Sequence, residues 1–386
     1  MRVRSPFRDV VAIRVAYWLA IAVTLLWEPL HTVSPFRAYT ALGDLLFDAF
    51  AKWDAVWFVH IADHGYDSKQ VTAFFPLYPL VVHAVSEVTR STVAAGVLVS
   101  LAAAGVAGAL VHAVARLRVE RHDADQAVLL LALYPLAFVF TAVYSDALFL
   151  ALSAGSFLAG LKRRSLLAGV LGGLAVATRL IGLALLPALA VLLWPRSRRE
   201  LPQLAPLLLL PAALGAYALY LRSHLGDGFA FLHAQGEYWH RHTPALGPLR
   251  GLWDATSSAY HGAAELALHL PRGAGQYRAP DAWAMWNVVQ FLLLVAAIWL
   301  TVLAWRRLGA AFGLYSAATI AIFLSSPAQF VPLVSEPRFL LSDFPLFVVL
   351  GSLAVERPRL RPWLWCGFAA VGGIAAVAFS RGSWVA

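Results

Sequence analysis

The sequence predicts an all-α protein that crosses a membrane many times. Three observations carry this prediction: the mean hydropathy is +0.70, only 13% of the 386 residues are charged, and apolar runs of about 18 to 24 residues recur along the chain. As a helix, each run is long enough to cross a hydrocarbon core roughly 30 Å thick. A soluble chain of this length would need far more polar surface.

Cysteine usage and charge narrow the class further. Cys366 is the only cysteine, so an internal disulfide and a cysteine metal cluster are excluded. The net charge of +9 is carried by arginine, which favours membrane topology and anionic lipid headgroups over nucleic acid. The first apolar run reaches about Leu30 without a small-residue cleavage site, so we expect a retained first span instead of a cleaved signal peptide.

Basic clusters set the predicted topology. Eighteen of the 30 Lys and Arg residues lie in short connections beside apolar runs, and the positive-inside rule places these in the cytoplasm: residues 1–8 with Arg14, 116–121, 162–164, 196–199, 306–307 and 357–361. About eleven spans satisfy this rule: 12–30, 92–115, 126–144, 146–161, 165–178, 180–194, 203–221, 283–304, 310–327, 339–355 and 363–380. The N-terminus is then inside and the C-terminus outside.

Two segments do not fit simple spans. "FFPLYPLVVHAVSEVT" (74–89) is too short to cross and holds two prolines, so we expect a half-helix that enters from the outer face and is buried against protein. Residues 165–178 and 180–194 are also short, which places Thr178 and Arg179 at an apex near the outer surface. We expect one membrane domain (1–386), with a long first outer loop at 31–73 and a large outer loop at 222–282.

Nearly every unusual polar residue falls on the predicted outer face. The stretch "WDAVWFVHIADHGYD" (53–67) holds three aspartates and two histidines. Asp54 is the leading candidate for a general base, because a carboxylate in a partly apolar cleft has a raised pKa; Asp63 and His64 are further catalytic candidates. The alternatives are solvated acids that cap helices, or a metal site made by Asp54, His60, Asp63 and His64, whose spacing matches no metal motif.

Other charged residues on this face have a structural and a functional interpretation. Asp146 in "YSDALF" caps a turn or is paired, because an unpaired acid at mid-bilayer costs roughly 2.5–3.5 kcal/mol. Arg179 lies among apolar neighbours and either forms an ion pair with Asp54 or Asp146 or binds substrate. Glu336 and Arg338 form an interfacial anchor pair or recognise a phosphate. Glu237 and Arg241, in the amphipathic "EYWHRH", are also substrate-binding candidates, although aromatic belts occur without function.

Several blocks together resemble the PIG-V family of mannosyltransferases, which add the second mannose to glycosylphosphatidylinositol, and their bacterial relatives. These blocks are "WDAVWFVHIADHGY", "AFFPLYPL", "YSDALF", "GLAVATRLIG", "SEPRFLLSDFPLF" and "RGSWVA", in this order across nearly the whole chain. The resemblance implies the GT-C glycosyltransferase fold, an active site on the outer face, a polyprenyl-phosphate mannose donor and inverting chemistry. Asp54 is then the candidate base, and Arg179 and Arg338 are candidates for the donor phosphate.

The same resemblance implies a sugar pocket and an acceptor. The pocket is shaped by Asp63, His64, Tyr66 and the block from Phe75 through Pro76 and Tyr78 to Pro79, with Trp53 beside Asp54. The acceptor is a glycolipid or a glycan. No metal or other cofactor is expected, since arginines can stabilise a leaving monophosphate. The rival interpretations are a secondary transporter, which typically shows inverted repeats that this chain lacks, and a noncatalytic lipid-binding partner.

Overall fold

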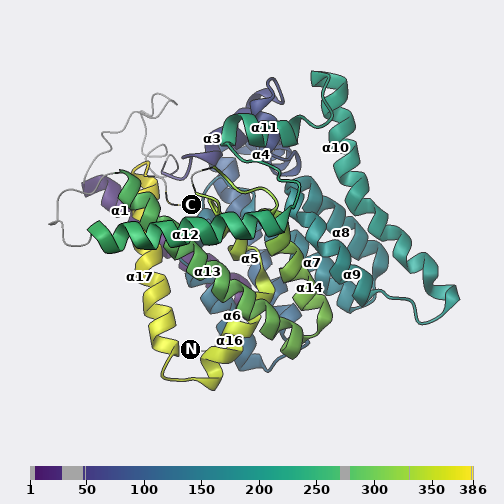
Figure 1. Cartoon of the computed structure of the whole chain (residues 1–386). Coiled ribbons are helices and arrows are strands. Elements are labelled where there is room, and N and C mark those ends of the chain that lie inside the picture. Colours follow the sequence, from purple (N-terminus) through teal and green to yellow (C-terminus); the bar gives the residue numbers. More distant parts are fainter. Residues whose placement is uncertain are drawn as a thin grey trace.

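The computed structural model describes residues 5–27, 47, 49–269, 279–329, 331–383 and 385, and it is a helical bundle (Figure 1). Helices make up 79% of the chain, and no strand forms within the described part, which confirms the all-α class. In chain order the α-helices and 3-10 helices (η) are α1 (Pro6–Trp27), α3 (Asp54–His64), η1 (Gln70–Ala73), α4 (Leu77–Thr89), α5 (Thr92–Ala115), α6 (Arg121–Leu133), η2 (Ala137–Phe140), α7 (Asp146–Leu161), α8 (Ser165–Thr178), η3 (Leu180–Ala184), α9 (Leu185–Leu192), η4 (Arg198–Leu208), α10 (Leu209–Leu225), α11 (Ala230–Trp239), α12 (Pro248–His269), α13 (Ala279–Leu308), α14 (Ala310–Leu324), α15 (Glu336–Leu341), α16 (Phe344–Glu356) and α17 (Arg361–Ser380).

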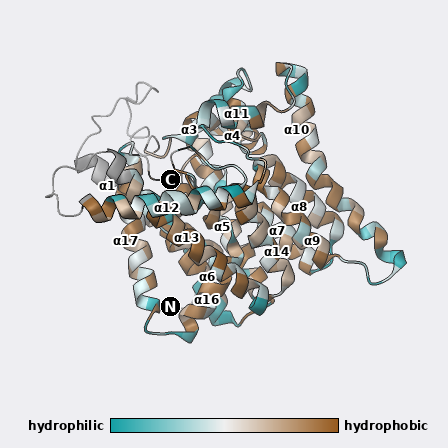
Figure 2. Cartoon of the chain, in the orientation of Figure 1, coloured by the Kyte–Doolittle hydropathy of each residue, from teal (hydrophilic) through white to brown (hydrophobic). Residues whose placement is uncertain are grey.

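Apolar helix length indicates a membrane protein. By length and composition, four helical stretches of the described chain can cross a membrane: Thr92–Ala115, Arg198–Leu225, Trp283–Leu308 and Arg361–Ser380. Shorter apolar helices, α7, α8, α14 and α16 among them, accompany these four. Hydrophobic residues extend along the central helices, and hydrophilic residues gather at helix ends and in connections (Figure 2). Most of the predicted spans coincide in sequence with helices. Parts of the first span and of both large loops lie outside the described residues.

Prolines interrupt two of the predicted spans. The expected segment 126–144 is helical only to Leu133, because Pro135 follows and disfavours helical geometry at Tyr134, whose φ and ψ are −50° and 139°. The expected segment 339–355 divides into α15 and α16, which begins at Phe344. Pro345 has no N–H to continue the helical ladder from Leu341, so the chain breaks at this point.

Glycines let α8 pack closely against the stretch formed by η4 and α10. A Cβ atom on Gly169 would lie 2.2 Å from the backbone oxygen of Pro206, and one on Gly173 would lie 2.9 Å from that of Leu209. Small residues at such crossings allow helices to approach closely within a membrane. The predicted apex is present: α8 ends at Thr178 and Arg179 is extended, with φ −158° and ψ 139°. This packing fixes the position of the Arg179 backbone at the end of α8.

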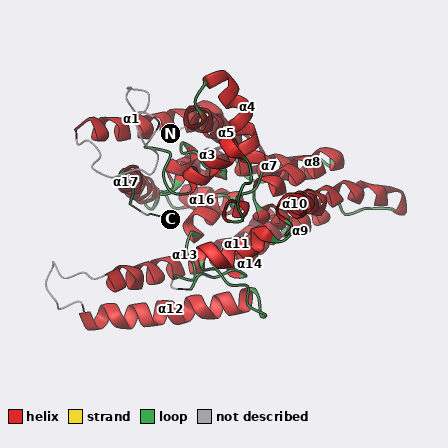
Figure 3. Cartoon of the chain, turned by 90° about the horizontal axis from the view of Figure 1, so that it is seen from above, coloured by secondary structure: helices red, strands yellow, loops and turns green. Residues whose placement is uncertain are grey.

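We call the end of the bundle that carries α3, η1, α11 and α15 the site end. The short helix α4 forms here as predicted within 74–89 and packs through Tyr78, Pro79 and Val82, while Leu80 and Val88 are exposed. The helix α12 lies across the bundle in Figure 1 and alongside α13 in Figure 3. A second pocket lies at the opposite end of the bundle. Its lining includes charged residues from three connections: Arg116, Arg118, Arg307 and Glu356.

Candidate active site

A cavity of about 410 Å³ lies at the site end, between helices from both halves of the chain. Its walls come from α3, α7, α11, α14 and α15 and from the loops between them. Five charged residues line it: Asp54, Asp146, Arg179, Arg241 and Arg338. All five were predicted as site residues, and their formal charges leave one positive charge in surplus. The structure therefore brings together residues from five separate segments of the sequence.

Asp54 begins α3, where a carboxylate is favoured by the partial positive charge of the helix N-terminus. Its Oδ2 accepts a hydrogen bond of 2.5 Å from Nη1 of Arg338. The Asp54 side chain is 23% exposed, so it can be reached from the cavity. The preceding residue, Trp53, has a positive φ of 57°, and its indole nitrogen donates to the Ser383 carbonyl at 3.2 Å, away from the cavity lining.

Asp146 and Arg179 form the most deeply buried ion pair of the cavity. Asp146 lies in the first turn of α7 with a side chain only 2% exposed, and Nη1 of Arg179 donates to its Oδ1. The Arg179 guanidinium also lies over the rings of Phe149 and Phe339, at 5.9 Å and 5.1 Å. The ion-pair interpretation of Arg179 is thus confirmed, with Asp146 as the partner. The same guanidinium also lines the cavity.

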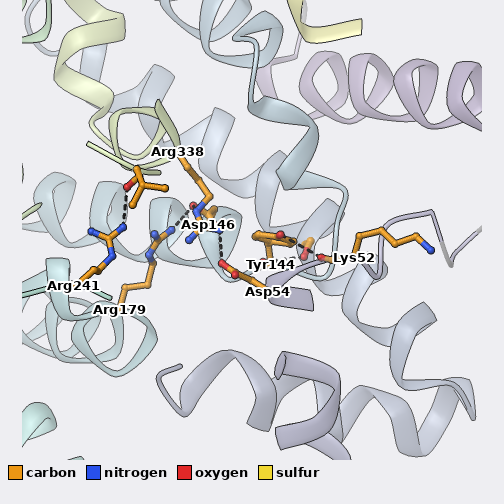
Figure 4. Close-up of polar contacts among 9 residues, drawn as sticks. Lys52, Asp54, Tyr144, Asp146, Arg179, Arg241 and Arg338 are labelled. Carbon is orange, nitrogen blue, oxygen red and sulfur yellow. Dashed lines mark hydrogen bonds and ion pairs between the residues drawn. The ribbon is translucent and has the colours of Figure 1, made fainter. Parts of the chain in front are cut away.

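Arg338 bridges the two aspartates (Figure 4). Its Nη1 donates to Asp54, its Nε lies 3.9 Å from Oδ1 of Asp146, and its guanidinium lies 5.3 Å from the centre of the Tyr144 ring. Burial by itself lowers the pKa of Arg338, but the carboxylates of Asp54 and Asp146 outweigh it and raise the pKa above the usual value. The guanidinium of Arg338 therefore remains a cation in the cavity wall.

Arg241 lines the cavity but uses its guanidinium on backbone carbonyls. Its Nη1 donates to the Ser326 carbonyl at 2.9 Å and its Nη2 to the Val334 carbonyl at 2.8 Å. Burial, and then the like charge of Arg338, lower the pKa of Arg241 to about 10, so it stays protonated at neutral pH. An isolated β-bridge joins Arg241 to Ala328. One residue thus holds both ends of the segment that leads into α15.

The other predicted residues on and after α3 mostly lie outside the cavity lining. Nine residues separate Asp63 from Asp54, which at about 100° per residue places them on opposite faces of one helix. Asp63 accepts a hydrogen bond of 2.5 Å from Thr92, and the exposed His64 stacks on His60. Tyr66 donates to the Phe74 carbonyl at 2.6 Å, and burial raises its pKa. These side chains border the site from outside.

The block after η1 divides between the cavity and the protein core. Phe75 lines the cavity, whereas Pro76 does not and Tyr78 is fully buried. The Tyr78 hydroxyl bonds to the Gly96 carbonyl at 3.1 Å and to the Ser100 hydroxyl at 2.8 Å, which anchors α4 on α5. Tyr78 therefore supports the wall instead of lining it.

The two predicted glutamates also lie outside the cavity lining. Glu237 is exposed on α11. Glu336 is fully buried at the start of α15, and neither carboxylate oxygen has a hydrogen-bond partner among the described residues. Burial raises the pKa of Glu336 to about 9, so it is a neutral acid at pH 7. The predicted anchor pair of Glu336 with Arg338 is absent, because Arg338 faces the two aspartates.

Some lining residues were not singled out from the sequence. Gln235, Trp239 and Thr243 line the cavity from α11 and the turn after it, and Tyr144 and Phe74 complete the aromatic part. Tyr144 and Trp239 lie in the stretches "YSDALF" and "EYWHRH", but only the charged members of these stretches were chosen as candidates from the sequence. For the metal alternative, no group of three or more His, Cys, Asp or Glu residues suited to a metal ion occurs within the described ranges.

Comparison with solved structures identifies the fold. ArnT from Cupriavidus metallidurans, solved bound to undecaprenyl phosphate, aligns with a TM-score of 0.54 and 17% identity over 95% of this chain and 64% of that one. The apo oligosaccharyltransferase from Archaeoglobus fulgidus aligns with a TM-score of 0.48 and 12% identity over 98% of this chain and 56% of that one. The chain thus spans less than two thirds of either protein's length. Its fold is that of the GT-C glycosyltransferases.

The family follows from the sequence itself. Residues 19–235, more than half of the chain, match the mannosyltransferase (PIG-V) family. The chain belongs to this family, and its long apolar helices are those of a membrane protein. Comparison with curated proteins finds no significant match.

Proposed function

We propose that this protein transfers mannose from a polyprenyl-phosphate donor to a glycolipid or glycan acceptor, with inversion at the anomeric carbon. The observation that carries the proposal is the cavity, where three arginines and two aspartates meet in a chain of the mannosyltransferase family. The undecaprenyl phosphate bound to ArnT, a protein of the same fold, supports a polyprenyl-phosphate donor.

The arginines suit a leaving phosphate. Arg179 and Arg338 both point towards Asp146 in Figure 4, and both line the cavity. A guanidinium presents paired N–H donors to phosphate oxygens, and preorganised donors stabilise charge that develops in a transition state. With this stabilisation, a monophosphate leaving group needs no metal ion. We therefore propose metal-independent transfer.

Apolar side chains beside Arg179 suit the donor's lipid tail. Leu180 and Ile181 follow Arg179 directly, and Phe231 with Leu232 on α11 and Ile322 with Phe323 on α14 continue the lining. Leu232 is 43% exposed. A polyprenyl chain is apolar along its whole length, so we place it along this part of the wall with its phosphate at Arg179 and Arg338.

Asp54 is the proposed general base. Of the two cavity aspartates, Asp146 is 2% exposed and Asp54 is 23% exposed, so Asp54 is the one that an acceptor can reach. The acceptor oxygen attacks the anomeric carbon and its proton passes to the Asp54 carboxylate. The bond from that carbon to the phosphate oxygen breaks, and its electron pair leaves with the polyprenyl phosphate. A β-linked donor then yields an α-mannoside.

We propose that the site end faces the extracytoplasmic side. The helix α5 runs from Thr92, which contacts Asp63, to Ala115, just before Arg116. Twenty-four residues of helix span about 36 Å, enough to separate the two ends by a bilayer core. Arg116, Arg118 and Arg307 share the opposite end, and basic connections favour the cytoplasm.

Transfer of radiolabelled mannose tests the function. Membranes containing the protein are supplied with polyprenyl-phosphate [³H]mannose, and membranes with Asp54→Ala serve as the comparison. We expect a labelled product and released polyprenyl phosphate only with the unchanged protein. Absence of transfer from this donor, with the protein folded and native lipids present, would remove the donor assignment.

A further inference from the structure

The helix α11 supplies a wall of the cavity that carries no charge. Phe231, Leu232, Gln235 and Trp239 line the cavity from this helix, and Thr243 lines it from the turn that follows. Residues four apart lie on one face of a helix, so Phe231, Gln235 and Trp239 form a single row. Within this row Phe231 is apolar, Gln235 is polar, and Trp239 is aromatic with an indole N–H.

The end of the row lies close to Asp54. The Trp239 ring packs against Trp57 and Phe74, with ring centres 6.3 Å and 5.5 Å apart. Trp57 follows Asp54 by three residues on α3, about one helical turn. Trp239 and Asp54 therefore border neighbouring parts of the cavity, while Phe231 continues the apolar side assigned to the donor.

The polar groups of this row are available to a ligand. The side-chain amide of Gln235 and the hydroxyl of Thr243 have no hydrogen-bond partner among the residues that the structure describes. Of the three cations that line the cavity, Arg179 and Arg338 are assigned to the donor phosphate, and the guanidinium of Arg241 donates to two backbone carbonyls. An additional anionic headgroup would therefore find no unengaged cation in the cavity lining.

We propose that Gln235, Trp239 and Thr243, here called the acceptor wall, bind the acceptor through an uncharged sugar ring. The inference rests on the proposed function and adds to it the place and the chemistry of acceptor binding. A sugar ring offers hydroxyls to the amide and hydroxyl groups and an apolar C–H face to the indole. Held there, one hydroxyl of the ring reaches Asp54, which receives its proton during transfer.

The test separates acceptor from donor binding in purified full-length protein. The acceptor probes are octyl α-D-mannoside and a serine-containing octapeptide, each with labelled polyprenyl-phosphate mannose. We expect transfer to the mannoside and not to the peptide. Trp239→Ala and Gln235→Ala should each raise the KM for the mannoside about fivefold or more, while the donor KM changes less than about twofold. Trp239→Phe should recover part of the loss, because the ring is retained.

Tyr238→Phe is the matched control, since Tyr238 is the exposed neighbour of Trp239 on α11 and lies outside the cavity lining. It should leave both KM values unchanged. A raised donor KM in Trp239→Ala would overturn the assignment of these residues to the acceptor. An unchanged mannoside KM in both Trp239→Ala and Gln235→Ala would overturn it as well. Transfer to the peptide alone would overturn the sugar assignment. Failure of the unchanged protein with both probes would instead remove the proposed function, and the inference with it.

Discussion

Nη1 of Arg338 donates a hydrogen bond of 2.5 Å to the carboxylate of Asp54, which lies 284 residues earlier in the sequence. Both side chains are partly accessible, at 14% for Arg338 and 23% for Asp54. In the proposed reaction the two residues have different roles. The Arg338 guanidinium stabilises the donor phosphate, and the Asp54 carboxylate accepts the proton of the acceptor. The pair therefore joins the donor and acceptor sides of the reaction in one contact.

Asp54→Asn tests the base. The amide keeps the size of the side chain and an oxygen that accepts from Arg338, but it cannot take the proton. We expect turnover to fall by about 10²- to 10⁴-fold at normal protein levels. Asp67→Asn is the control, because Asp67 is an exposed acid nearby that bonds to His60. Normal turnover in Asp54→Asn would contradict the assignment of the base.

Breaking the buried pair of Asp146 and Arg179 should affect stability as well as activity. Asp146→Ala leaves the buried guanidinium without its nearest carboxylate. Loss of one partner of a buried pair costs roughly 3–5 kcal/mol. We expect a clearly lower thermal midpoint in detergent for Asp146→Ala than for Asp67→Ala. Equal midpoints would show that the pair is not needed to hold α7 and α8 together.

Arg241 is expected to act by positioning Arg338. Its guanidinium holds the carbonyls of Ser326 and Val334, on both sides of the loop before α15. Arg241→Ala should lower kcat/KM by about tenfold or more, since two carbonyls lose their donor. In an Arg338→Lys background the same change should add little, because coupled residues are not additive. Fully additive losses would indicate that Arg241 contacts the donor directly.

Because Glu336 is buried, we expect the free energy of unfolding to depend on pH. Burial raises its pKa to about 9 in the folded state, against 4.5 for a free side chain. Between these values the folded protein holds a proton that the unfolded chain has released. The free energy of unfolding therefore falls as the pH rises through this window, by up to about 1.4 kcal/mol per pH unit. The thermal midpoint of Glu336→Gln in detergent should depend less on pH, and equal slopes would contradict the assignment.

Metal removal should leave the activity intact. Because arginines are proposed to stabilise the leaving phosphate, millimolar EDTA is expected to change the transfer rate by less than about twofold. The measurement compares labelled product with and without the chelator, followed by added Mg²⁺ or Mn²⁺. Loss of activity that a metal restores would show that an ion takes part.

Helix positions could be predicted largely because their signals are local. The lengths of the apolar runs located the helices. The polar pair Thr178 and Arg179 marked a break between two short runs. Two proline breaks were missed as helix ends, at Pro135 and Pro345, although proline is itself a local signal. The all-α class and the break at Arg179 followed from residues that lie next to one another in the sequence.

The pairing within the site was less predictable, because residue types do not specify partners across long separations. Arg179 had two candidate partners, and only the fold selects Asp146. Arg241 was placed among substrate-binding residues, but it bonds to backbone carbonyls, which any residue could supply. Glu336 was paired with Arg338 by proximity in the sequence, yet the two side chains point to different surroundings on the short helix α15.

The charged residues of the cavity are synthesised at very different times. Asp54, Asp146 and Arg179 enter the growing chain early, and the pair of Asp146 and Arg179 spans only 33 residues. Arg338 is made much later, so the Asp54 carboxylate gains its hydrogen-bonded cation only after most of the helices have been made. Contacts between residues so far apart in sequence carry a large loop-closure entropy and are slow to form. A chain that stops before α15 lacks Arg338, so the proposed site is complete only when the last part of the protein has been made.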